Sequence, residues 1–192
     1  DNSNCDVLKP ASSPALTSGT DAPRMKGRPL PLEHDMTPGT AFAAAHVEHT
    51  GEFTLPLTLA EAFPLFTPEG ERAYVPGWDP EYLHPREPSA AAGTVFRTRA
   101  EGEEALWVVL ECDPAAGRAA YGRFTPGSRL GTVRVRCAAE GERQTRITVT
   151  YALTATSPHG NEALAGFDAA ALAAKLEGWR DAILQCLETG AG

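Results

Sequence analysis

Hydrophobic and polar residues alternate along several stretches of the chain, and short turns separate these stretches. Side chains of a β-strand point alternately to the two faces of a sheet, so a period of two predicts a half-buried strand. The connectors AEGE, DPAAG, PGS and EGE are hairpin-sized and contain Gly or Pro, which predicts antiparallel pairing of neighbours. The pattern predicts strands at 46–55, 93–99, 104–112, 118–125, 129–139 and 143–156.

Two short helices are predicted directly after the first strand. Thr58 starts the first helix as its N-cap, and Glu61 three residues later completes a capping box. Pro64 keeps this helix short or kinks it, because proline lacks a backbone donor. Thr67 and Pro68 start the second helix, since Thr is a favoured N-cap and Pro is favoured at the first helical position.

A long helix is predicted for residues 161–189. Its apolar residues recur at three-, four- and five-residue steps, which gives one apolar stripe, and Gly190 ends the helix. The stripe consists of Leu164, Phe167, Leu172, Leu176, Trp179, Ile183 and Leu187.

Together these elements predict an α+β fold with a curved antiparallel sheet of six to seven strands, two short helices after the first strand and a long C-terminal helix. The helices must cover the apolar face of the sheet. Because a helix is only about 10 Å wide, one long helix cannot fill a broad concave sheet. We therefore expect a cavity between the sheet and the C-terminal helix.

The segment YVPGWDPEYLHP (74–85) joins the helical and strand-rich parts of the chain. Its three prolines exclude a helix or a central strand. It nevertheless carries Trp78, Tyr82 and Leu83, which are residue types that tend to be buried.

Composition separates the first 40 residues from the remainder. Residues 1–40 are rich in Pro, Ser, Thr, Gly and Asp, with isolated apolar residues and no periodicity. Such a segment buries too little apolar surface to offset its ordering entropy, so we expect a disordered or extended tail. Residues 41–192 then form the folded domain.

Charge, hydropathy and cysteine content limit the expected partners and cellular location of the protein. The net charge of −8 argues against nucleic acid as a partner. No apolar run approaches the roughly 20 residues of a membrane-spanning helix, and no signal-peptide pattern is present. The four cysteines are far apart and lack metal-site spacing, so we expect free thiols and a cytoplasmic location. The sequence leaves the oligomeric state open.

The order of strand, two short helices, antiparallel sheet and long helix resembles the START-like superfamily. This is the helix-grip fold of polyketide cyclases and Bet v 1-type allergens, also called SRPBCC proteins. The segment FTPEGERAYVPGWDPEYLHP (66–85) is similar to the segment after the first strand in bacterial members. The resemblance covers about residues 44–189. Members bind lipids, hormones, polyketides or aromatic compounds, and some are catalysts.

The resemblance implies that a hydrophobic or aromatic small molecule binds between the sheet and the C-terminal helix. Aromatic side chains are the expected contacts, because flat walls suit a flat ligand. Of the strand tyrosines, Tyr151 is in phase with the buried set and is a better candidate than Tyr121. For Trp78, simple packing at the end of the domain is the alternative. The expected ligand-binding residues are Trp78, Tyr82, Phe96, Trp107, Tyr151, Phe167 and Trp179.

Two other functions stay open. One is a cyclase- or hydratase-like enzyme that uses acid and base residues of the same cavity, such as Asp79 with His84 or Glu111 with Tyr151. Glu111 is in phase with Trp107, so it faces the cavity if Trp107 does, and otherwise it is a solvated carboxylate. Asp79 has a turn or cap role as its alternative. The other function is that of a partner-binding regulatory protein.

No cofactor and no metal are expected. His46 and His49 point to opposite faces of a strand, so they cannot share a metal ion. Motifs of common hydrolases, zinc proteases and nucleotide-binding enzymes are missing from the sequence. Arg134, Arg136 and Arg146 occupy the water-facing phase of their strands, so we interpret them as ordinary surface residues.

Overall fold

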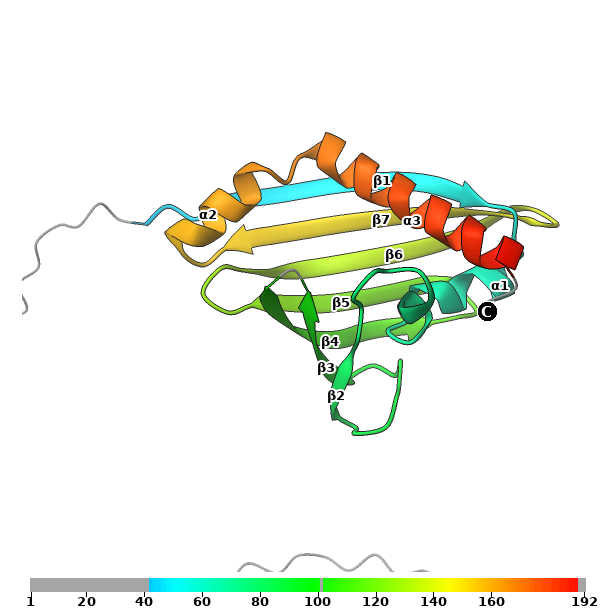
Figure 1. The fold of residues 1–192 in the computed structure, drawn as a ribbon, viewed down its shortest axis with the longest axis horizontal. Helices are drawn as coiled ribbons and strands as arrows, with labels where there is room; N and C mark the ends of the chain where they lie inside the picture. The colour runs from blue at the N-terminus through cyan, green and yellow to red at the C-terminus, as the bar shows by residue number, and fades with distance from the viewer. Residues whose placement is uncertain (1–41, 101, 190–192) are drawn as a thin grey trace, which may run out of the picture. The chain divides into compact units, whose positions relative to one another are not determined.

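The computed structural model describes residues 42–100 and 102–189, which form a seven-stranded antiparallel sheet with helices along one face (Figure 1). The strand order is β1-β7-β6-β5-β4-β3-β2, so the last strand returns to pair with the first. This architecture confirms the predicted α+β fold. The strands are β1 (His46–Leu55), β2 (Glu81–His84), β3 (Val95–Ala100), β4 (Glu103–Asp113), β5 (Arg118–Thr125), β6 (Arg129–Gly141) and β7 (Gln144–Ala155). The predicted tail, residues 1–40, lies outside the described residues.

The first of the two short helices after β1 begins as predicted, and the second begins later than predicted. The Thr58 hydroxyl accepts a hydrogen bond from the Glu61 amide, and the Glu61 carboxylate accepts one from the Thr58 amide at 2.8 Å. This capping box starts α1 (Leu59–Ala62), which continues into the 3-10 turn η1 (Phe63–Phe66). The second short helix is the 3-10 turn η2 (Gly70–Ala73), so the prediction that Thr67 caps it and Pro68 is its first residue was wrong: Glu69 occupies the N-cap position. The Thr67 hydroxyl instead accepts a hydrogen bond from the Gly70 amide at 3.1 Å, in the turn before η2.

The segment 74–85 contains the short strand β2 at the edge of the sheet. This position agrees with the prediction that the prolines exclude a helix or a central strand. An edge strand tolerates neighbouring prolines because one side of its backbone has no partner strand.

The C-terminal helix is not continuous, and the prediction of one helix over 161–189 was wrong. The chain forms α2 (Pro158–Ala165) and α3 (Ala169–Thr189), separated by a turn at 166–168. Gly166 is the C-cap of α2, and the Asp168 carboxylate accepts a hydrogen bond from the Ala171 amide at 2.8 Å. Asp168 therefore restarts the helix in a new direction, because an Asp at this position satisfies a free amide.

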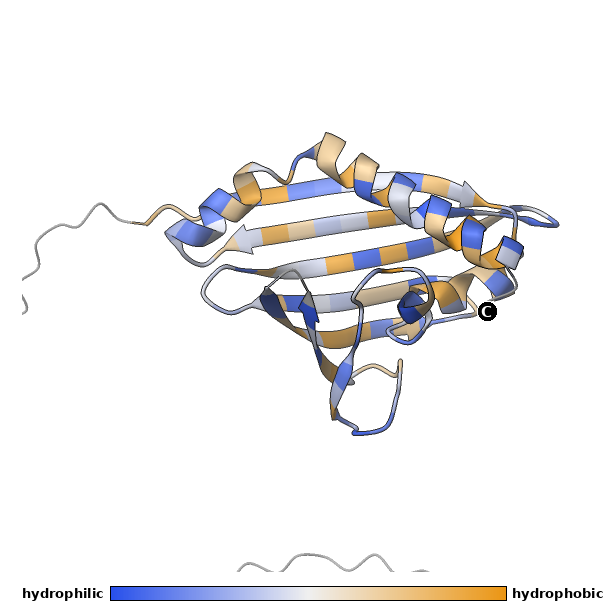
Figure 2. Ribbon diagram, viewed as in Figure 1, coloured by the Kyte–Doolittle hydropathy of each residue, from blue (hydrophilic) through white to orange (hydrophobic). Residues whose placement is uncertain are grey.

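One face of the sheet is buried beneath α3. Apolar and polar residues alternate along the strands in Figure 2, as the period of two requires. Gly51 of β1 lets α3 approach closely, since a Cβ atom there would lie 2.6 Å from Leu176 of α3. The inward-facing residues of the two longest strands are Val133, Val135, Cys137, Ile147, Val149, Tyr151 and Leu153, and all are buried.

Within residues 42–100 and 102–189, no helix is long and apolar enough to cross a membrane. Cys112, Cys137 and Cys186 are free thiols, while Cys5 lies outside the described residues. Burial raises the pKa of the Cys137 thiol to about 12, so this cysteine behaves as a small apolar core residue.

Candidate ligand-binding site

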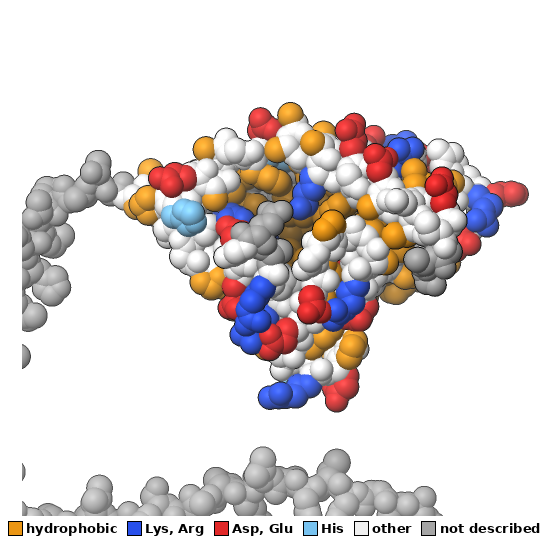
Figure 3. Space-filling view, viewed as in Figure 1, with side chains coloured by type: hydrophobic (Ala, Val, Ile, Leu, Met, Phe, Trp, Pro, Cys, Tyr) orange, Lys and Arg blue, Asp and Glu red, His pale blue; other side chains and the backbone are white. Residues whose placement is uncertain are grey.

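A cavity of about 440 Å³ lies between the sheet, α3 and the segment 68–78. Figure 3 shows it as a hollow below α3 with hydrophobic atoms on its walls. Strands β3 to β7 contribute side chains from the concave face of the sheet, and α3 and the turn before it contribute the opposite side. Small-molecule sites typically have volumes of about 300–1,000 Å³, so this cavity has the size of a ligand site.

One wall of the cavity is a cluster of three aromatic rings. Trp107 and Phe96 stack with ring centroids 5.9 Å apart, and Trp78 meets Trp107 edge to face at 5.5 Å. The Trp107 indole N–H donates to the Thr98 hydroxyl at 3.0 Å, and that of Trp78 donates to the Pro68 carbonyl at 2.7 Å. Because both indole N–H groups have partners, this wall is apolar and held in place.

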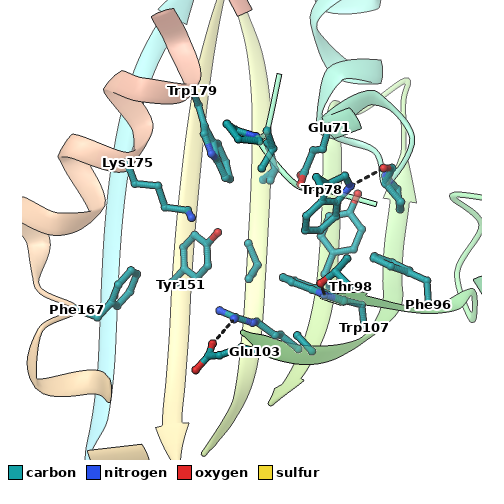
Figure 4. Close-up of a pocket in the computed structure, with 18 of the residues that line it drawn as sticks. Glu71, Trp78, Phe96, Thr98, Glu103, Trp107, Tyr151, Phe167, Lys175 and Trp179 are labelled. Carbon is teal, nitrogen blue, oxygen red and sulfur yellow. Dashed lines mark hydrogen bonds and ion pairs between the residues drawn. The ribbon is translucent and has the colours of Figure 1, made fainter. Parts of the chain in front are cut away.

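Side chains from β7, α3 and the turn before α3 form the opposite wall (Figure 4). Phe167 lies in the α2–α3 turn and packs edge to face on Tyr151 at 5.4 Å. Lys175 lies one turn before Trp179 on α3, and its Nζ is 5.4 Å from the centre of the Trp179 ring. The break between α2 and α3 thus places an additional ring in the cavity.

Six of the seven residues expected to bind a ligand line the cavity, and the exception is Tyr82. Tyr82 is the cross-strand neighbour of Phe96 but belongs to the edge strand β2, one strand further from the cavity. Its hydroxyl donates to the Glu69 carboxylate at 2.8 Å. The six lining residues are Trp78, Phe96, Trp107, Tyr151, Phe167 and Trp179.

A buried carboxyl group faces the aromatic walls. Glu71 of η2 is only 9% exposed, and its side chain makes no hydrogen bond within the described part of the chain. Burial raises the pKa of Glu71 to about 8, and the positive charge of Lys175 opposes this shift. Glu71 is therefore mostly protonated at neutral pH. The sequence provided no clear signal for this residue.

The two strand tyrosines have different roles. The Tyr121 hydroxyl donates to the Phe66 carbonyl at 2.7 Å and so fixes η1 against the sheet. The Tyr151 hydroxyl has no hydrogen-bond partner among the described residues, and its side chain lines the cavity. Burial raises the pKa values of both phenols, so both stay neutral. Tyr151 is thus available to a ligand as donor or acceptor.

Two arginines and a glutamate line the cavity at the ends of β4, β5 and β6. Arg129 holds the Glu103 carboxylate with two hydrogen bonds, of 2.9 and 2.6 Å, which lower the pKa of that carboxyl group. The Arg123 guanidinium lies 5.3 Å from the centre of the Trp107 ring. Burial lowers the pKa of Arg123, and the charge of Arg129 adds to this effect.

These charged cavity residues were not predicted from the sequence, although the positions of two of them pointed to the cavity. Arg123 is in phase with Tyr121 on its strand, and Lys175 lies four residues before Trp179 on its helix. Arginine and lysine side chains usually face water, and Arg134 and the other exposed arginines of β6 and β7 do so.

The acid–base pairs suggested by the sequence do not form in the cavity. Asp79 pairs with Arg72, and its side chain is 82% exposed. The register of β4 against β5 shifts between Val109 and Glu111, and this irregularity turns Glu111 to the surface although Trp107 faces the cavity. Glu111 there accepts from Arg118 at 2.8 Å, as a solvated carboxylate. The expectation that Glu111 follows Trp107 was therefore wrong.

The two histidines of β1 have separate surroundings. The Nδ1 atom of His46 is 2.9 Å from the Thr154 hydroxyl, whereas the His49 ring lies 6.0 Å from that of Phe167. Within residues 42–100 and 102–189, no group of three or more His, Cys, Asp and Glu side chains is arranged to hold a metal ion.

Fold and cavity together define a helix-grip protein with a cavity lined by aromatic side chains. Norcoclaurine synthase from Thalictrum flavum has a similar structure, with a TM-score of 0.56 at 11% identity over 79% of this chain and 99% of that chain. A hypothetical protein from Helicobacter pylori superposes with a TM-score of 0.58 at 14% identity, covering 71% of this chain and 84% of the other. An uncharacterised protein from Rhizobium leguminosarum gives a TM-score of 0.50 at 16% identity, over 71% and 88% of the two chains.

These similarities confirm the helix-grip fold that the sequence resemblance implied. No protein-family model and no curated protein sequence matches the chain.

Proposed function

We propose that the protein binds a hydrophobic or aromatic small molecule in the cavity beneath α3. The observation that carries this proposal is the cavity of about 440 Å³ between two walls that contain aromatic rings. A fully packed core leaves few voids larger than a water molecule, so a void of this size is a feature of a binding site. A norcoclaurine synthase structure contains dopamine and hydroxybenzaldehyde, which supports aromatic ligands for this fold.

Filling the cavity should abolish binding without unfolding the protein. Ala171 of α3 lines the cavity, so Ala171→Trp places an indole in the ligand space. We expect the affinity for N-phenylnaphthylamine, a neutral probe that fluoresces in apolar sites, to fall at least about tenfold. Probe fluorescence during titration measures this directly.

Ala174→Trp is the matched control, because Ala174 is exposed on the same helix. It adds the same ring outside the cavity and should leave the affinity unchanged. Equal affinity of both variants would show that the probe binds elsewhere. Native mass spectrometry of protein purified without denaturation would then identify a ligand carried from the cell.

An acid–base enzyme is the second candidate function, and Glu71 is the specific observation that favours it. The carboxyl group has a pKa of about 8 and lines the same cavity as Tyr151 and Lys175 (Figure 4). A carboxyl group with a pKa near the working pH can exchange protons with a bound molecule efficiently.

Ring opening of nitrobenzisoxazole tests whether Glu71 can act as a base. The Glu71 carboxylate takes the proton from the ring carbon, the N–O bond breaks, and the electron pair ends on the oxygen of a cyanophenolate. The rate should rise with pH and level off above about 8, because the carboxylate is the active form. Glu71→Gln should lower the rate about a hundredfold. An unchanged rate in this variant would remove Glu71 from the proposed chemistry.

A further inference from the structure

Arg123 lines the cavity with a charged group that lacks hydrogen-bond partners among the described residues. Its side chain is 19% exposed, yet its guanidinium makes no hydrogen bond within the described part of the chain. The Nε atom is fully enclosed without a partner. The Glu103 carboxylate, its ion-pair partner among the described residues, is 3.7 Å from Nη2, which is too long for a hydrogen bond. Buried donors in folded proteins nearly always have partners, so this group needs an explanation.

The charges around Arg123 also indicate that its guanidinium can bind a further group. Among the described residues, Glu103 is the one carboxylate paired with Arg123 and Arg129, and Arg129 already holds both of its oxygens. Arginine stays protonated in proteins, so these three described side chains together carry an excess positive charge. In a partly enclosed site, such a charge attracts an anion more strongly than on the surface.

We propose that Arg123 binds the anionic group of an aromatic ligand, such as a carboxylate or sulfonate, inside the cavity. The guanidinium is planar and presents parallel N–H groups, which matches the oxygens of such an anion. Contact with the Trp107 ring restricts the orientation of the guanidinium, so less conformational freedom is lost on binding. The ring system of the ligand then lies between the aromatic walls. This inference rests on the proposed binding function and specifies its ligand class.

Two fluorescent probes that differ in one group test the proposal. Anilinonaphthalene sulfonate carries a sulfonate, whereas N-phenylnaphthylamine has the same ring system without it. The full-length protein should bind the sulfonate at least as tightly as the neutral probe and should release the neutral probe when the sulfonate is added. A clear preference for the neutral probe would overturn the inference, although the proposed function would stand. No binding of either probe would contradict both.

Variants of Arg123 separate charge recognition from general packing. Arg123→Gln should weaken sulfonate binding about tenfold to a hundredfold, because hydrogen bonds to a charged group are lost. It should leave the affinity for the neutral probe within about twofold. Arg134→Gln is the matched control, since it removes the same charge from the exposed face of β6 and should change neither affinity. If a folded Arg123→Gln variant lost affinity for both probes to the same extent, the proposal would be contradicted.

If Arg123→Gln does not fold, Arg123→Lys tests whether the guanidinium binds the anion. Lysine keeps the positive charge and the apolar stem but lacks the planar fork of N–H groups. We therefore expect sulfonate binding between that of the wild type and complete loss, with neutral-probe binding unchanged. Wild-type sulfonate affinity in this variant would show that the guanidinium makes no specific contact, and the inference would fail.

Discussion

Replacing Glu71 by Gln should change stability little near pH 5 and should stabilise the folded protein by about 3–5 kcal/mol near pH 9. The folded wild type must hold a carboxylate in the cavity at high pH, whereas the variant holds a neutral amide of similar shape. Burial is the main reason for the cost, since the Glu71 carboxyl group is almost inaccessible and makes no hydrogen bond within residues 42–100 and 102–189.

The direction of this pH dependence follows from the pKa values of Glu71 in the folded and the unfolded state. Burial raises the pKa from 4.5 to about 8 in the folded protein, so between these values the folded state keeps a proton that the unfolded chain has released. The stabilising effect of this proton is complete below about pH 4.5 and declines as pH rises, by about 1.4 kcal/mol per unit. Above about pH 8 both states are ionised and the decline stops.

Other titrating groups near Glu71 do not obscure this effect. Tyr74, Tyr121 and Tyr151 face the same space, but burial raises their pKa values above the ordinary value of 10.0. They therefore stay neutral across the window from 4.5 to about 8. Lys175 acts in the opposite direction, since its positive charge lowers the pKa of Glu71.

Urea unfolding of both proteins across this pH range measures the effect. The difference between wild type and Glu71→Gln cancels the contributions of all other groups. Glu177→Gln serves as the control, because Glu177 is exposed on α3 and its removal should give a curve parallel to the wild type. Parallel curves for Glu71→Gln as well would show that this carboxyl group is solvated in the folded state.

The fold was predictable because strand periodicity depends on local sequence. Along the middle of β6 and β7 most inward residues are apolar and most outward residues are polar or charged, so much of the burial pattern could be inferred directly. The capping box at Thr58 was also visible, since its partner Glu61 is only three residues away. Features of this kind need no knowledge of the tertiary structure.

The helix break and the strand irregularity were harder to predict. Leu164, Phe167 and Leu172 keep an approximately helical spacing across the break, so periodicity alone could not reveal it. Only the Gly166 and Asp168 signals, a C-cap followed by an N-cap, marked the new start. The shift before Glu111 depends on pairing with a neighbouring strand, which a single-strand pattern does not contain.

The polar part of the site was not predictable because it depends on long-range packing. Trp107 was expected in the cavity as an aromatic residue although its strand phase left its orientation open, whereas strand phase placed Tyr151 on the buried face. Arg123 has the same phase, but an arginine is buried only where an aromatic ring and a carboxylate lie nearby. Glu71 reaches the cavity through a compact turn whose geometry depends on a single glycine.

That glycine is Gly70, and Gly70→Ala should lower the free energy of unfolding by about 3 kcal/mol or more. A Cβ atom there would lie 2.0 Å from the Pro64 carbonyl oxygen and 2.8 Å from the Leu65 Cα atom. Both are backbone atoms of η1, so no side-chain rotation relieves the clash. The turn must open instead, which moves the adjacent Glu71 away from the cavity.

The same substitution at Gly178 is the control for Gly70→Ala. Gly178 lies within α3 and has open space around its Cα atom. Alanine favours helix more than glycine does, so Gly178→Ala should stabilise the protein by about 0.5–1 kcal/mol. Thermal and urea unfolding compare the two variants, and opposite signs are the expected result. If Gly70→Ala kept wild-type stability, η1 and η2 would not be in close contact, and the assignment of Glu71 to the cavity would lose its structural basis.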